Sequence, residues 1–244
     1  MSKIIVEVCA NSFSSALAAQ KAGAHRIELC SSLNSGGLTP SAGTIKSVLK
    51  TLDIPVFVLI RPRAGDFLYS REEFEVMKED IIYAKNRGAA GVVLGILNAD
   101  AEIDVKRCSE LVSLAKPMQV TFHRAFDRVM SSSSALEDVI KTGATRILTS
   151  GLSEKAVNGK QTIRKLVEQA NGRIAIMAGG GINPQNAAEI VSDTGVKEIH
   201  ASCSVSLNSK MTWLIRFSSF DLGYSHTVAD AATIRKMLDS INTV

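Results

Sequence analysis

A short apolar run followed by a helix-length segment recurs eight times along this chain, and this alternation restricts the fold more than any other feature. One run, Val56 to Ile60, has no polar residue at all. Uninterrupted apolar runs are typical of parallel strands that are covered on both faces. The predicted strands lie at residues 5–9, 26–30, 56–60, 91–95, 118–123, 146–149, 174–177 and 198–201.

Helix signals fill the intervals between these runs. Ser12 or Asn11 can cap a helix that stops at Gly23, and Ser41 can cap the next one. The segment from Ser70 to Arg87 starts with acidic residues and ends with basic ones, which complements the helix dipole. Further helices are predicted at about residues 104–115, 136–141, 162–170, 183–192 and 227–241.

Eight strand-then-helix units predict a closed (β/α)8 barrel of the TIM type, with a doubly wound open sheet as the alternative. Gly23-Ala24, Gly88-Ala89, Gly143-Ala144 and Gly195-Val196 all precede even-numbered strands, and this regularity favours the ring. The 244 residues show no linker, so we expect one domain over residues 1–244. Residues of about 205–226 should form an irregular segment before the last helix.

Composition excludes several functional classes. The net charge of +4 is spread along the chain, and eight Phe, three Tyr and one Trp are too scattered to stack nucleic-acid bases. No apolar run is long enough to span a membrane, and Glu7 interrupts the single candidate for a secretory signal. We therefore expect a cytoplasmic protein that uses neither nucleic acid nor membrane. Its four cysteines should be thiols, metal ligands or reactive groups rather than disulfides.

Polar side chains gather where the predicted strands end, which is where barrels of this type build their sites. Glu7-x-Cys9 ends the first strand, and Glu28-x-Cys30 repeats the pattern on the second. The two-residue period of a strand puts each glutamate on the same face as its cysteine. Later strands end in further polar residues, namely Arg61 with Asp66, His123 with Arg124, and Ser202.

Several long motifs surround these strand ends. They are Glu-Val-Cys at 7–9, Arg-Ile-Glu-Leu-Cys at 26–30, Gly-Gly-Leu-Thr-Pro at 36–40, Ile-Arg-Pro-Arg-Ala-Gly-Asp-Phe at 60–67, Val-Thr-Phe-His-Arg-Ala-Phe-Asp at 120–127, Leu-Thr-Ser-Gly at 148–151 and Met-Ala-Gly-Gly-Gly-Ile at 177–182. Together they resemble the CutC copper homeostasis family over roughly residues 3 to 205. The tail departs from the family pattern from Met211 to Arg216.

The resemblance implies a cytosolic barrel protein of copper handling, with Cu(I) binding at Cys9 and Cys30 and a homo-oligomeric state such as a dimer or tetramer. The copper would be bound transiently and could be absent from the resting protein. Soft thiolates select Cu(I), and thiols on adjacent strands about 4.8 Å apart can reach one ion. The alternative is that both cysteines are small buried hydrophobic residues.

The polar ring also supports an enzyme hypothesis. His123 could act as general acid or base with Glu28 or Glu7 as its partner, while Arg61 or Arg124 would hold an anionic or phosphorylated metabolite and Asp66 would complete the ring. A buried salt-bridge layer would equally explain Arg61 and the glutamates, and His123 could be a satisfied core histidine. His25 and His226 are expected on the surface.

A second group of candidates could bind an anion. Gly179, Gly180 and Gly181 follow the seventh strand, and Asn183 would cap the next helix, so backbone N–H groups could bind phosphate there with Ser202 nearby. Tight-turn geometry is the alternative reason for the glycines. The serines at 131–134 should form a loop and a helix cap, and Cys108 should pack on a helix.

Overall fold

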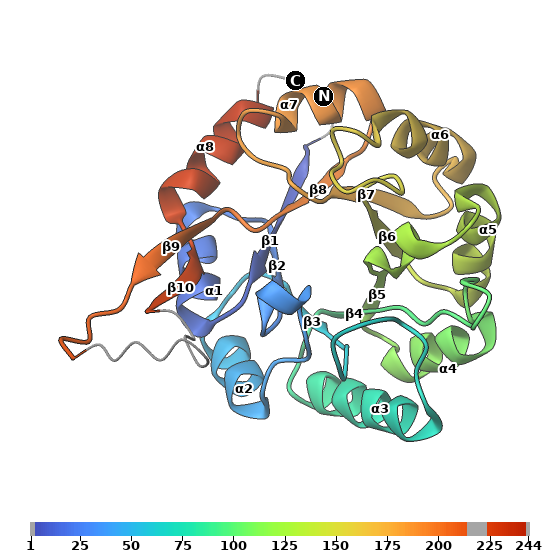
Figure 1. The fold of residues 1–244 in the computed structure, drawn as a ribbon, viewed down its shortest axis with the longest axis horizontal. Coiled ribbons are helices and arrows are strands. Elements are labelled where there is room, and N and C mark those ends of the chain that lie inside the picture. Colours follow the sequence, from blue (N-terminus) through green and yellow to red (C-terminus); the bar gives the residue numbers. More distant parts are fainter. Residues whose placement is uncertain (1–2, 214–223, 243–244) are drawn as a thin grey trace.

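The computed structural model describes residues 3–213 and 224–242, and its centre is a closed barrel of eight parallel strands (Figure 1). Each strand pairs with the next one in the chain, and β1 pairs with β8 to close the ring. The strands are β1 Ile5–Ala10, β2 Arg26–Leu29, β3 Val56–Leu59, β4 Gly91–Leu94, β5 Gln119–Phe122, β6 Arg146–Thr149, β7 Ala175–Gly179 and β8 Glu198–Ala201. The predicted (β/α)8 barrel is confirmed, and the open sheet is excluded.

Helices surround the barrel, with α8 packed between α1 and α7 where the chain returns to its start (Figure 1). They are α1 Phe13–Ala22, α2 Ala42–Thr51, α3 Arg71–Asn86, α4 Val105–Ala115, α5 Ser132–Thr142, α6 Lys160–Ala170, α7 Ala187–Thr194 and α8 Ala231–Ile241, with single 3-10 turns η1 Leu33–Ser35 and η2 Arg124–Arg128. The side chains of Ser12, Ser41 and Ser131 accept backbone N–H groups at helix starts, as predicted. Within the described ranges, no helix is both long and apolar enough to cross a membrane.

Side chains alternate between the barrel interior and the surrounding helices along each strand. In β2, Ile27 and Leu29 belong to the large apolar core between strands and helices. Arg26 points the other way and reaches Met177 and Glu198 on the far strands β7 and β8. Barrel closure therefore brings residues from distant parts of the sequence into one interior.

The four glycines that precede even-numbered strands share one backbone conformation. Gly23, Gly88, Gly143 and Gly195 have φ values of 94°, 83°, 83° and 73°. Residues with a Cβ atom are strained in this left-handed region, so glycine ends each helix at low cost. The helix-ending glycine turn that the sequence indicates is therefore present at all four positions.

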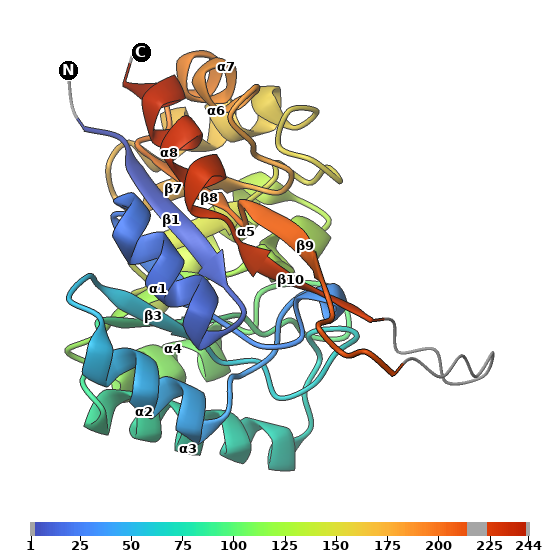
Figure 2. The ribbon, with the colours of Figure 1, turned by 90° about the vertical axis from the view of Figure 1, so that its left-hand side faces the viewer.

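The chain after β8 differs from the sequence prediction. In place of a wholly irregular segment, β9 Ser204–Asn208 and β10 Ser225–Ala229 form an antiparallel pair that projects beyond the barrel (Figure 2). The last helix begins at Ala231, four residues later than predicted, because residues 225–229 are a strand. Arg216 lies outside the described residues.

Candidate functional site

A closed network of buried charges lies in the barrel interior near the N-terminal ends of the strands, a region called the lower layer. Arg26 pairs with Glu7 and also donates from Nη2 to Glu198 Oε2 at 2.6 Å. Arg146 pairs with the same Glu198. Both guanidinium groups also lie near the Phe57 ring, whose centroid is 4.9 Å from that of Arg26 and 5.3 Å from that of Arg146. Charged and aromatic groups thus fill the base of the barrel.

Glu7 belongs to this network rather than to the rim of the barrel. Its Oε1 lies 2.8 Å from Nδ1 of His200, and its side chain is fully buried. Burial alone would raise the pKa of Glu7, but the hydrogen bond with His200 and the charge of Arg26 outweigh it and lower the pKa to about 2. Burial opposes protonation of His200, yet the carboxylates of Glu28 and Glu7 raise its pKa. Glu7 therefore matches the salt-bridge alternative.

Two thiols and a carboxylate form a compact cluster above this layer. The Sγ atoms of Cys9 and Cys30 lie 3.5 Å apart, and Cys9 Sγ lies 3.6 Å from Glu28 Oε1. The parallel register of β1 and β2 pairs Cys9 with Glu28, and Cys30 follows directly after β2. All three residues are buried, and Phe57 and Leu59 pack against the sulfurs. The sequence pattern did place both thiols side by side.

The donors of this cluster fit a soft metal ion. Ligand atoms of Cys9, Glu28 and Cys30 all lie within 4.8 Å of one another. With metal–sulfur bonds of about 2.3 Å, the length found for zinc thiolates, a linear ion would need sulfurs about 4.6 Å apart. At the observed 3.5 Å separation, an ion bound to both sulfurs would have a bent S–metal–S angle. Cys9 and Cys30 would hold such an ion, and Glu28 could supply a third donor.

The protonation of the cluster affects metal binding. The hydrogen bond with Cys30, burial and the negative charge of Glu28 raise the pKa of Cys9 well above its usual value. Burial raises the pKa of Glu28, although the nearby His200 opposes this effect. Cys9 is therefore a neutral thiol at pH 7, and a metal must displace its proton to bind.

His123 lies in the wall of the same mouth, immediately after β5. Its Nδ1 accepts the backbone N–H of Ala125 at 3.2 Å, and the side chain is 6% exposed. Burial and the charge of Arg61 lower its pKa to about 3. No hydrogen bond joins it to Glu28 or Glu7. The structure thus gives His123 a neutral imidazole at pH 7, in contrast to the acid–base pair expected from the sequence.

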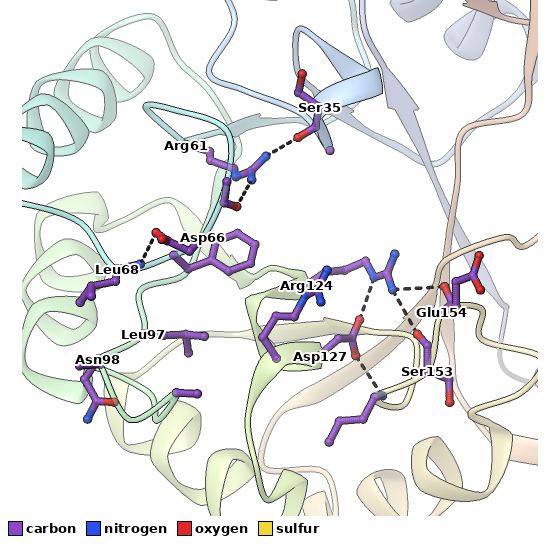
Figure 3. Close-up of a pocket in the computed structure, with 17 residues that line it drawn as sticks. Ser35, Arg61, Asp66, Leu68, Leu97, Asn98, Arg124, Asp127, Ser153 and Glu154 are labelled. Atoms are coloured by element: carbon purple, nitrogen blue, oxygen red, sulfur yellow. Dashed lines mark hydrogen bonds and ion pairs between the residues drawn. The ribbon is translucent and has the colours of Figure 1, made fainter.

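Arg61 follows β3 and joins the loop after β2 to the loop after β3. Its Nη1 donates to the carbonyl oxygens of Ser35 and Gly37, and its Nη2 donates to that of Gly65, each at 2.8 Å (Figure 3). The guanidinium also lies over the ring of Phe67, at 5.1 Å from its centroid. Arg61 is 5% exposed, so its charge is buried among neutral groups.

Arg124 is fixed by the buried carboxylate of Asp127, three residues along the chain. Asp127 pairs with Arg124 Nε at 2.7 Å and also accepts hydrogen bonds from Thr149 Oγ1 and the backbone N–H of Ser150 and Leu152. Arg124 Nη2 donates to Ser150 Oγ at 2.7 Å. Asp127 therefore orients Arg124 and the loop after β6 together.

Two cavities open at this end of the barrel. The inner cavity, of about 310 Å³, is bounded by the candidate residues Cys9, Glu28, Arg61, His123, Arg124, Gly180, Gly181 and Ser202, and by His200. The outer cavity, of about 1040 Å³, includes Asp66, Leu97 and Asp127 (Figure 3). Arg61, Phe67 and Arg124 line both, so they separate the inner space from the outer one.

Some candidates lie away from the inner cavity. Asp66 is exposed and bonds to Arg63 at 2.9 Å. Gly179 is packed so tightly that a Cβ atom would lie 2.5 Å from Leu148 Cδ1, which explains the glycine without an anion. Asn183 does not cap α7, since Asn186 occupies the N-cap position and the helix begins at Ala187. The helix N-terminus therefore lies three residues later than predicted, while Gly180, Gly181 and Ser202 line the inner cavity.

The remaining histidines and cysteines complete the comparison with the sequence. His226 is exposed on β10, whereas His25 is half-buried and accepts the N–H of Val6 at 2.9 Å. Cys108 is buried on α4, as expected for packing. The sequence analysis did not select Arg26, Arg146 and Glu198, although the same two-residue strand period that pairs Glu28 with Cys30 also turns them inward.

Fold and site together define a (β/α)8-barrel protein with a buried thiol–carboxylate cluster at its mouth. The model of the CutC family matches residues 4–205, and the chain belongs to that family. It is 45% identical over 240 residues to the human copper homeostasis protein cutC homolog, covering 96% of this chain and 87% of the human one. The family protein CutC of Vibrio vulnificus is 45% identical over 98% of both chains. A solved CutC structure from Streptococcus agalactiae matches with a TM-score of 0.78 and 37% identity, over 82% of this chain and 98% of that chain.

Proposed function

We propose that this chain is a copper homeostasis protein that binds Cu(I) through Cys9 and Cys30, with Glu28 as a third donor. The observation that carries this proposal is the pair of buried sulfurs 3.5 Å apart beside a carboxylate. Thiolates are soft ligands that select Cu(I) over harder ions. The names of the human and mouse relatives, both copper homeostasis protein cutC homologs, support the same role.

Binding at this cluster exchanges protons for copper. The neutral Cys9 thiol loses its proton when the sulfur bonds to the ion, so affinity rises with pH. The apolar groups Phe57, Leu59 and Val93 shield one side of the sulfurs from water. The cysteines of the described residues are free thiols, which supports a reducing compartment such as the cytoplasm. Copper is the cargo of such a protein.

An anaerobic Cu(I) titration against a competing chelator tests this proposal. The wild-type protein should bind about one Cu(I) per chain, and the Cys9→Ser, Cys30→Ser double variant should lose that binding. The matched control is Cys108→Ser, Cys203→Ser, which removes two buried thiols that lie elsewhere. Unchanged stoichiometry in the first double variant, or equal losses in both, would overturn the proposal.

A second candidate function is an enzyme that acts on a small anionic or phosphorylated metabolite. The inner cavity favours it, because about 310 Å³ suits a small molecule and Arg61, His123 and Arg124 converge on it. Glu28 is the acid or base that this function would use. Glu28→Gln should fold normally yet lose its stabilisation by the metabolite, and an intact thermal shift would count against the enzyme.

A further inference from the structure

Three buried side-chain polar atoms of the described residues lack a hydrogen-bond partner, and all three lie near one loop. They are Arg61 Nε, Tyr69 Oη and His123 Nε2. Arg61 and Tyr69 flank the β3–α3 loop, and the ring of Phe67 in that loop lies 4.8 Å from the His123 ring. Buried polar groups are nearly always paired in native proteins, so this concentration calls for a ligand.

The hydrogen-bonding role of His123 follows from its one protein contact. Because Nδ1 accepts the N–H of Ala125, Nδ1 carries no proton in the neutral ring. The proton must then be on Nε2, a buried donor without an acceptor on a residue that lines the inner cavity. An unmet buried donor costs about 1–3 kcal/mol.

Arg61 also lacks a partner, in this case an anion to balance its positive charge. Its three described hydrogen bonds go to neutral carbonyl oxygens, and none of the described ion pairs involves it. Arg26 and Arg146, which are equally buried, both face the carboxylate of Glu198. A buried cation without an anion is costly, and Arg61 Nε still has an N–H to donate.

We propose that the inner cavity binds a small oxyanion whose oxygens accept hydrogen bonds from His123 Nε2 and Arg61 Nε. Both unmet groups are donors, and an oxyanion offers only acceptors, so carboxylate and phosphate groups share the required chemistry. Arg124 stands at the boundary of the two cavities, but its charge is already paired with Asp127, so Arg61 is the cation that lacks an anion. Tyr69 lines neither cavity and interacts with the Arg61 guanidinium, so its hydroxyl needs no ligand from the cavity.

The two sides of the inner cavity would then have different ligands. Cys9 and Glu28 line one part of its wall with soft and acidic donors, while Arg61 and His123 supply the anion-binding part. This oxyanion site does not rest on the copper proposal, because it uses none of the thiols. The site rests on the second candidate function in one respect: the oxyanion that it binds would be the acidic group of that metabolite.

Nitrogen-15 NMR of the histidine-labelled wild-type protein is the primary test. Before addition of anion, His123 should show a neutral, Nε2-protonated ring between pH 6 and 8. Inorganic phosphate or malonate should shift the Nε2 resonance saturably and raise the melting temperature, relative to sodium chloride at equal ionic strength. A response to phosphate alone identifies a phosphate site, and a response to malonate alone identifies a carboxylate site. No response to either probe would overturn the proposal.

Two variants locate the binding. Arg61→Lys keeps the charge but removes Nε, and His123→Asn keeps an acceptor for Ala125; each should weaken anion binding about tenfold or more, the effect of one charge-assisted hydrogen bond. His226→Asn, on exposed β10, is the matched control and should bind like the wild type. Equal binding by all three variants would place the anion elsewhere. Loss of anion binding with intact Cu(I) binding would separate this site from the copper site.

Discussion

Buried charges are paired with opposite charges in the lower layer of the barrel interior, but the buried charge of Arg61 at its mouth is not. In the lower layer, Arg26 and Arg146 both face carboxylates, and Glu7 pairs with Arg26 and hydrogen-bonds with His200. At the mouth, Arg61 has neutral partners but no described ion pair, and His123 Nε2 has no partner. The charges of the lower layer satisfy one another and support the fold. The proposed copper and oxyanion sites both lie at the mouth.

The largest expected effect comes from breaking the lower layer. Arg26→Met leaves Glu7 with His200 alone and Glu198 with Arg146 alone, and removal of one partner from a buried pair costs about 3–5 kcal/mol. Urea unfolding measures this loss. Arg164→Met removes an exposed ion pair on α6 and should be neutral within error. Similar stability for both variants would show that the layer does not support the fold.

The pH dependence of stability sharpens the contrast at the mouth. His123 has a pKa of about 3 in the folded protein against 6.5 for an unperturbed histidine. Its neutral form is therefore favoured on folding, and that contribution is complete above pH 6.5 and is lost as the pH falls toward 3. Between pH 6.5 and 5 the loss is about 2 kcal/mol. His123→Asn should show a correspondingly shallower decline in urea unfolding, and an unchanged slope would contradict a neutral, buried His123.

The smallest expected effect concerns Asp66, which the sequence placed in the polar ring. Its carboxylate is exposed and its pKa is lowered by the hydrogen bond from Arg63. Such a surface pair contributes little to stability. Asp66→Ala should therefore leave both the urea midpoint and Cu(I) binding within error of the wild type. A clear loss of Cu(I) binding would show that the copper site lies farther out, in the loop after β3.

Local sequence rules were sufficient for the fold. Apolar runs marked the eight barrel strands, and the left-handed turns at Gly23 and Gly88 follow from glycine chemistry. The prediction was wrong for the start of α7, because either Asn183 or Asn186 could cap a helix by local pattern alone. It also missed the strand pair after β8, where strand and irregular segment look alike in short polar sequences.

The site was predictable only in part. Strand period and adjacency brought Cys9, Glu28 and Cys30 together, since all three depend on neighbouring strands. The pairing of Arg26 with Glu198 depends on ring closure between β1 and β8, which no local pattern encodes. The protonation of His123 depends on burial and on one backbone contact. Charge partners across the barrel thus required the three-dimensional structure.

X-ray absorption at the copper edge tests the central claim most directly. Cu(I)-loaded wild-type protein should show two sulfur neighbours and one light oxygen neighbour, because Cys9, Cys30 and Glu28 form one cluster. In the Cys9→Ser, Cys30→Ser variant the sulfur signal should vanish. A wild-type spectrum with nitrogen and oxygen neighbours alone would contradict a thiol copper site at the barrel mouth.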